Sequence, residues 1–113
     1  MYILGLDFET TWTEPVNPKL ARPTEVGAVL YDTEKRMPVR IYNSLVYDPS
    51  DYPNSPQELV DLTGISDDML EKNGIMPNEM LEVLNSLLDI SDYVLAHNGL
   101  EFDKVIYEEE CER

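Results

Sequence analysis

The chain has 113 residues, of which 42% are hydrophobic, and its 23 acidic and eight basic residues give a net charge of −15. This apolar content supports one packed domain and excludes a disordered acidic tail, and no apolar run is long enough for a membrane-spanning helix. The charge excludes the basic footprint of a protein that binds nucleic acid tightly through its phosphates.

Three strands are predicted in the first half of the chain. Residues 2–8 (YILGLDF) are nearly all apolar, which is typical of a central strand, and a second strand over residues 24–32 ends at the turn DTEKR. Residues 39–47 alternate β-branched and aromatic side chains with polar ones, and we expect them to run antiparallel to their neighbours. The proline-rich segments 13–23 and 48–56 are predicted to be loops.

Two short helices are predicted next. Ser55, which precedes a proline, is a favourable start for a helix over residues 55–62. Ser66 is expected to cap a second helix, which carries acids in its first turn and closes at Gly74.

The rest of the chain predicts helix, strand and helix. Residues 77–90 form an amphipathic helix that begins near a proline. Its apolar face comprises Met80, Leu81, Leu84, Leu87 and Leu88. Residues 92–98 are expected to form a short buried strand, and residues 101–113 a helix. The inward face of that last helix comprises Phe102, Val105 and Ile106. The order of elements indicates an α/β domain with a mixed sheet flanked by helices.

The location of the protein and the extent of its domain follow from weaker signals. Cys111 is the single cysteine, so no internal disulfide forms, which suits a reducing compartment. The first residues lack the basic region and cleavage site of a secretion signal. We therefore expect a cytoplasmic protein without a membrane partner. The final EEECER has no helix terminator, so we expect the chain to be the first part of a larger domain.

Two carboxylates stand together in the first strand. Asp7 and Glu9 are two residues apart and therefore point the same way. Such a pair is costly to bury unless a positive charge compensates. Asp103 opens the last helix, and it joins the pair at one sheet edge if strand 92–98 lies beside the first strand. Three carboxylates without a second histidine or a cysteine pair favour Mg²⁺ or Mn²⁺ over zinc.

Four segments resemble, in the same order, motifs of the DnaQ-like branch of the DEDD exonuclease superfamily, which has a ribonuclease H-like fold. They are LDFETT, PTEVGAVLYD, LTGISDDML and AHNGLEFD. The resemblance implies a ribonuclease H-like mixed sheet with three antiparallel strands followed by a parallel one. It also implies that residues 1–113 are the N-terminal part of a single exonuclease domain, incomplete at its C-terminal end.

The activity implied by this resemblance is that of a 3′–5′ exonuclease. Such an enzyme hydrolyses phosphodiester bonds at nucleic-acid 3′ ends, DNA being favoured, with two Mg²⁺ or Mn²⁺ ions. The acids corresponding to Asp7, Glu9 and Asp103 hold the metals and are the catalytic residues in that family. Thr10 and Phe8 are expected at the terminal nucleotide of a single strand, and Phe8 is also expected in the core.

Supporting roles follow from the same resemblance. His97 is expected to pin the local turn rather than to act as a general base, and Asn98 to bond to the backbone in that turn. Glu25 is expected behind the metal ligands. Trp12 is expected either to stack on a base or to cover its loop.

The third motif of the family has no counterpart here. That motif supplies a fourth acid and a histidine or tyrosine that orients water, whereas Tyr107 and Glu110 only mimic its spacing in the wrong helix. We expect a downstream region or a partner chain to supply the fourth acid. Two alternatives stay open: a non-catalytic exonuclease-like binding or assembly module, and an exoribonuclease that trims RNA or short oligonucleotides.

Overall fold

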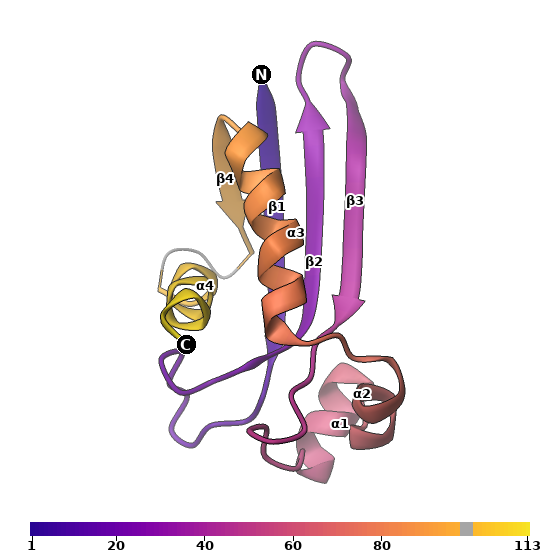
Figure 1. Cartoon of the computed structure of the whole chain (residues 1–113), viewed down its shortest axis with the longest axis vertical. Helices are drawn as coiled ribbons and strands as arrows, with labels where there is room; N and C mark the ends of the chain where they lie inside the picture. Colours follow the sequence, from indigo (N-terminus) through magenta and orange to yellow (C-terminus); the bar gives the residue numbers. More distant parts are fainter. Residues whose placement is uncertain (98–100) are drawn as a thin grey trace.

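A computed structural model describes residues 1–97 and 101–113 of the chain. Its centre is a four-stranded sheet in the order β3-β2-β1-β4 (Figure 1). The strands are β1 (Tyr2–Thr10), β2 (Pro23–Asp32), β3 (Met37–Leu45) and β4 (Tyr93–Ala96). β1 pairs antiparallel with β2, β2 pairs antiparallel with β3, and β4 runs parallel to β1. The predicted mixed sheet is therefore confirmed.

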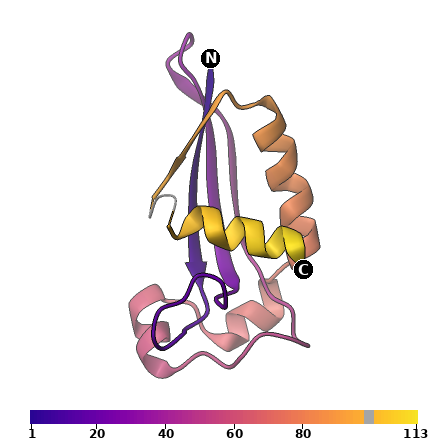
Figure 2. The ribbon, with the colours of Figure 1, turned by 90° about the vertical axis from the view of Figure 1, so that its left-hand side faces the viewer.

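The helices gather on one face and at one end of this sheet. They are α1 (Gln57–Thr63), α2 (Asp67–Asn73), α3 (Pro77–Ile90) and α4 (Asp103–Glu112). α3 lies along one face, whereas α1 and α2 lie beyond the end at which β1 finishes (Figures 1 and 2). Among the described residues, no helix covers the opposite face. None of the helices in the described ranges is long and apolar enough to cross a membrane.

The core lies between the sheet and helices α3 and α4. Along β1 the side chains alternate as a strand requires: Leu4, Leu6 and Phe8 are buried, whereas the intervening residues point to the uncovered face. The buried partners from the other elements are Val26, Ala28, Leu30, Met80, Leu84, Leu87 and Ile106. Since each fully buried aliphatic side chain stabilises a fold by about 1.5–3 kcal/mol, this layer holds β1 in place.

The helix ends confirm some predictions and correct one. Ser66 caps α2, because its Oγ accepts a hydrogen bond from the Met69 N–H at 3.2 Å. Ser55 does not cap α1: the cap residue there is Pro56 without a side-chain bond, and the Ser55 N–H instead donates to Asp67. Gly74 closes α2 in an extended conformation, and a Cβ at this position would lie 2.6 Å from Tyr47 Cβ. Close approach therefore requires glycine there.

The fourth strand is exposed rather than buried, which corrects the prediction for residues 92–98. β4 is at the edge of the sheet and spans Tyr93–Ala96, and Leu95 retains 65% of its surface exposed. β3 also begins two residues earlier than predicted. Pro38 lies in it without breaking the sheet, because β3 is the other edge strand, where a missing N–H is tolerated.

Candidate active site

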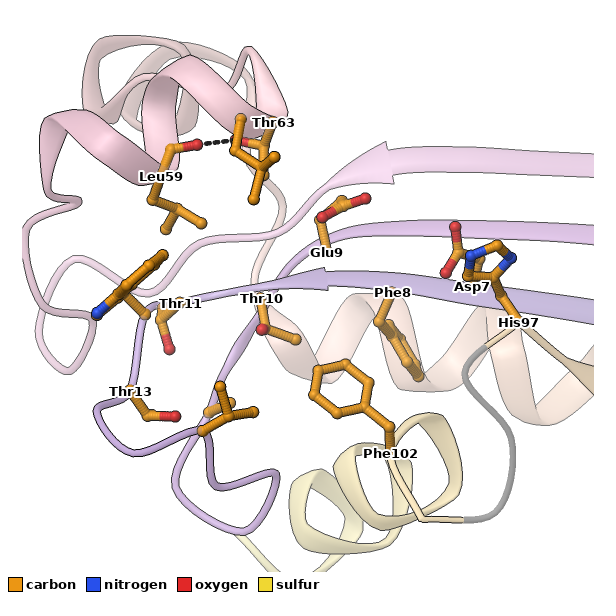
Figure 3. A pocket seen from close by; sticks show the side chains of 14 residues that line it. Asp7, Phe8, Glu9, Thr10, Thr11, Thr13, Leu59, Thr63, His97 and Phe102 are labelled. Atoms are coloured by element: carbon orange, nitrogen blue, oxygen red, sulfur yellow. Dashed lines mark hydrogen bonds between the residues drawn. The ribbon is translucent and has the colours of Figure 1, made fainter.

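Asp7 and Glu9 lie on the uncovered face near the end of β1. Asp7 is opposite Gly27, and Glu9 is opposite Glu25 on the neighbouring strand. Directly opposed residues of antiparallel strands have Cβ atoms about 4.5–5.5 Å apart, so Glu25 adds a third carboxylate to this patch. The predicted common orientation of Asp7 and Glu9 is seen in Figure 3, where Phe8 points to the other side of the strand.

Asp103 reaches the same strand from α4. β4 pairs with β1 only from Ile3 to Leu6. Beyond that point the N–H of Phe8 donates to Oδ1 of Asp103 at 3.3 Å, and the Asp103 side chain is fully buried. Asp103 thus lies at the edge of β1, beside the backbone of Phe8. The prediction that β4 lies beside β1 and brings Asp103 to this end of the strand is confirmed.

The neighbouring carboxylates of this patch lie close enough to Glu9 to raise its pKa. Burial raises the pKa of Glu9 above its ordinary value of 4.5, and the nearby carboxylates of Asp7, Glu25 and Asp103 raise it further. His97 opposes this rise in the pKa only in part. The cause is the accumulation of like charges in a partly desolvated place, which a bound cation would relieve.

Two pockets meet at this patch. One, of about 250 Å³, is lined by Asp7, Glu9, Thr10 and Phe102 (Figure 3), and Trp12 also lines it. The other, of about 420 Å³, lies over the uncovered face at Gly5 and Gly27. Asp7 and His97 line both pockets. A ligand in either pocket would therefore lie next to Asp7, and one in the smaller pocket also next to Glu9.

The donor set fits a hard divalent cation. Carboxylate oxygens are the ligands that Mg²⁺ and Mn²⁺ prefer, and the pKa of Glu9 is raised by burial first and then by the neighbouring carboxylates. Within residues 1–97 and 101–113, however, no three His, Cys, Asp or Glu side chains converge closely enough to hold a metal ion. The described side chains therefore have the chemistry of metal ligands, but they are not arranged around a common point as the ligands of a bound ion are.

The remaining predicted residues are placed as follows. Thr10 is half-buried and lines the smaller pocket, whereas Phe8 is 2% exposed and belongs to the core as well as to the pocket wall. The side chain of His97 is exposed. Its backbone N–H donates to the carbonyl of Leu6 at 3.0 Å, which extends the pairing of β4 with β1. Asn98 lies outside the described residues.

Sequence reasoning missed a buried ion pair next to the site. Nε of Arg22 donates to Oε1 of Glu110 at 2.6 Å, and Arg22 also pairs with Asp51. The sequence carries one signal for half of it: Glu110 lies seven residues after Asp103 and hence on the same face of the helix, which indicates a buried acid but does not identify its partner. Glu110 therefore pairs with Arg22 and is no substitute for the third motif.

Solved structures of similar fold are nucleases. E. coli exonuclease I in complex with a dA16 oligonucleotide matches with a TM-score of 0.82 at 22% identity, covering 98% of this chain and 23% of that one. A zinc-bound form of an E. coli exonuclease I complex with single-stranded DNA also matches with a TM-score of 0.82, at 22% identity, covering 98% of this chain and 23% of that one. This chain thus spans about a quarter of the length of these proteins. No curated protein sequence matches it.

The family is established by a match to its sequence model. The model of the RNase_T exonuclease family matches residues 4–113, a range that contains Asp7, Glu9 and Asp103. The predicted resemblance to DEDD exonucleases and the predicted ribonuclease H-like fold are both confirmed. The chain belongs to the RNase_T exonuclease family of the DEDD superfamily.

Proposed function

We propose that the protein is a 3′–5′ exonuclease that removes nucleotides from single-stranded DNA ends. The observation that carries the proposal is that Asp7, Glu9 and Asp103 all lie at the same end of β1. Two divalent cations, when bound, supply an activated water and stabilise the departing oxygen. The role of the chain is to hold those cations through Asp7, Glu9 and Asp103, while a downstream region or partner chain adds the fourth acid.

The pocket supports a terminal nucleotide beside these acids. Thr10 and Phe8 lie along its wall, and Trp12, 41% exposed, offers a flat apolar surface to a base. The net charge of −15 repels a phosphate backbone, so we infer that contacts to the end of the strand dominate over contacts along its length. His97 and Glu25 adjoin the carboxylates and orient them. The DNA complexes of exonuclease I support a single strand as the substrate.

A digestion assay tests this proposal. The chain is incubated with a 5′-labelled single-stranded oligonucleotide and Mn²⁺, beside Asp7→Asn and a control, Asp89→Asn, which changes an exposed acid on α3. The expected result, when the region or partner that supplies the fourth acid is also present, is a ladder that shortens from the 3′ end with wild type and the control and is absent with Asp7→Asn. Digestion unchanged by Asp7→Asn would contradict the assigned site. An RNA strand is tested in parallel, and faster digestion of RNA than of DNA would favour the exoribonuclease alternative.

One observation favours a second candidate, a non-catalytic binding or assembly module. It is the absence of a convergent three-ligand metal group within the described residues. Calorimetric titration with Mn²⁺ distinguishes the two functions. Binding in the millimolar range or tighter that Asp7→Asn weakens supports the exonuclease. No binding, together with no digestion, supports the module.

A further inference from the structure

One face of α4 carries two acids separated by an apolar side chain. Asp103, Ile106 and Glu110 are the buried residues of this helix. Seven residues separate the two acids, which corresponds to about two turns, or roughly 10 Å along the helix axis. Asp103 accepts a hydrogen bond from the Phe8 N–H, and Glu110 pairs with Arg22. Directional contacts therefore hold α4 at both ends of its buried face.

The contact at Glu110 fixes both a distance and an angle. Nε of Arg22 donates to Oε1 at 2.6 Å, and Nη2 donates to Oε2 at 3.2 Å. Such a two-pronged pair restrains the orientation of both side chains. Arg22 is held from its other sides by the Asp51 carboxylate and by the ring of Tyr52, whose centroid lies 4.9 Å from Cζ. These contacts fix the position and the orientation of the Arg22 guanidinium group.

Arg22 is also joined to the strand that carries the other two acids. The N–H of Thr11 donates to the Arg22 carbonyl at 2.8 Å, and the N–H of Arg22 donates to Oγ1 of Thr11 at 2.9 Å. Thr11 follows Glu9 by two residues. A continuous path of short contacts thus leads from the end of β1 through Arg22 and Glu110 to α4.

We propose that the Arg22–Glu110 pair is a positioning device that sets the rotation and axial position of α4, so that Asp103 meets β1 beside Asp7 and Glu9. This inference rests on the proposed function, in which these carboxylates act together. Apolar contacts such as that of Ile106 are non-directional and fix no angle. Buried ion pairs often stabilise a fold no more than apolar side chains of similar volume. Placement, rather than stability, is therefore the effect expected of this pair.

The decisive variant is Arg22→Met/Glu110→Leu, which replaces the pair by apolar side chains of similar size. Asp51 loses its partner Arg22 and Arg113 loses its partner Glu110, but both are exposed, so no unpaired buried charge remains. The control is Glu108→Gln, which changes an exposed acid of the same helix that pairs with Lys104. The first readout is hydrogen exchange of the Phe8 amide by NMR, which reports its bond to Asp103 without any metal. The second is the dissociation constant for Mn²⁺.

The expected result is exchange at Phe8 at least about tenfold faster and Mn²⁺ binding at least about tenfold weaker, since outer partners of metal ligands contribute about 10–100-fold to affinity. The melting temperature and the control stay near wild type. Glu110→Gln keeps an oxygen for Nε and is expected to retain part of the protection; it also decides the question if the double variant does not fold.

Two results would overturn the inference. One is wild-type exchange and affinity in the variants; the other is losses that only follow a lowered melting temperature, which indicate a purely structural pair. Absence of Mn²⁺ binding in the wild type contradicts the proposed function instead, and the exchange of Phe8 then still decides the positioning role.

Discussion

Asp103 and Phe8 are 95 residues apart in the chain and are joined by a hydrogen bond of 3.3 Å from the Phe8 backbone N–H to the Asp103 carboxylate. This bond lies just beyond the residues that β4 pairs with β1. Asp103 thus completes the hydrogen bonding of the central strand, besides its proposed role as a metal ligand. The same side chain thus has an observed structural role, as the acceptor for the Phe8 N–H, and a proposed chemical role, as a metal ligand.

Two substitutions separate these roles. Asp103→Ala leaves a buried N–H without its acceptor, and we expect it to lower the free energy of unfolding by about 1–3 kcal/mol. Asp103→Asn keeps an oxygen acceptor and is expected to preserve most of that stability while weakening Mn²⁺ binding. Thermal melts and Mn²⁺ titrations of both variants measure the difference. If Asp103→Asn binds Mn²⁺ like the wild type, Asp103 is not a metal ligand.

A matched pair of tyrosine substitutions is expected to change stability in opposite directions. The Tyr52 hydroxyl donates to the carbonyl of Pro23 at 2.5 Å, so Tyr52→Phe loses a buried hydrogen bond, at a cost of about 0.5–1.5 kcal/mol. The Tyr42 hydroxyl is buried and has no hydrogen-bond partner among the described residues, so Tyr42→Phe removes an unsatisfied group and raises stability. Urea unfolding measures both. Equal effects of the same sign would contradict this account.

The carboxylate patch predicts a pH-dependent gain from Glu9→Gln. The pKa of Glu9 is raised in the folded chain above 4.5, mainly by burial and then by Asp7. A raised pKa means that the folded state holds this proton more tightly, so stability is fully present below pH 4.5 and falls as the pH rises through the folded pKa. Glu9→Gln should therefore melt higher than wild type at pH 7, with the gain disappearing near pH 4.

Divalent cations should stabilise the wild type more than they stabilise Glu9→Gln. Mn²⁺ stabilises the folded chain by binding to it, and Glu9 is one of the proposed ligands. At pH 7 the melting temperature of the wild type should therefore rise more with added Mn²⁺ than that of Glu9→Gln. The corresponding control is Glu82→Gln, at an exposed position of α3, which should respond like the wild type.

Trp12 provides a direct probe of substrate binding. It is the single tryptophan of the chain, is 41% exposed and lines the pocket beside Glu9. Titration with a single-stranded oligonucleotide and Ca²⁺ should change its fluorescence, and Trp12→Ala should weaken binding by about 1–3 kcal/mol if a base stacks on the ring. Unchanged affinity in Trp12→Ala would indicate that Trp12 only covers its loop, the other role considered for it.

Local periodicity accounts for the parts of the fold that could be predicted from the sequence. The common face of Asp7 and Glu9 follows from strand alternation, and the Pro77–Ile90 helix from its apolar stripe and its proline start. Both features depend on residues close together in the chain. They hold in the structure because the tertiary packing agrees with them.

The features that were missed depend on long-range pairing. A short apolar run such as Tyr93–Ala96 is compatible with a central strand and with an edge strand. The sequence of this segment therefore could not predict its position at the edge of the sheet. Arg22 and Glu110 are 88 residues apart, and no spacing rule connects them. Asp103 could be placed only because β4 lies beside β1, which is a statement about topology rather than about periodicity.

The double contact between Thr11 and Arg22 also closes residues 12–21 into a loop at the end of β1. The chain leaves β1 and re-enters the sheet at the same point, and within the loop Ala21 is anchored in the core whereas Val16 and Leu20 are exposed. Doubling the length of such a closed loop costs only about 0.6 kcal/mol. A longer loop would therefore change the wall of the pocket, which Trp12, Thr13 and Val16 line, at little cost in stability and without moving the carboxylates on β1.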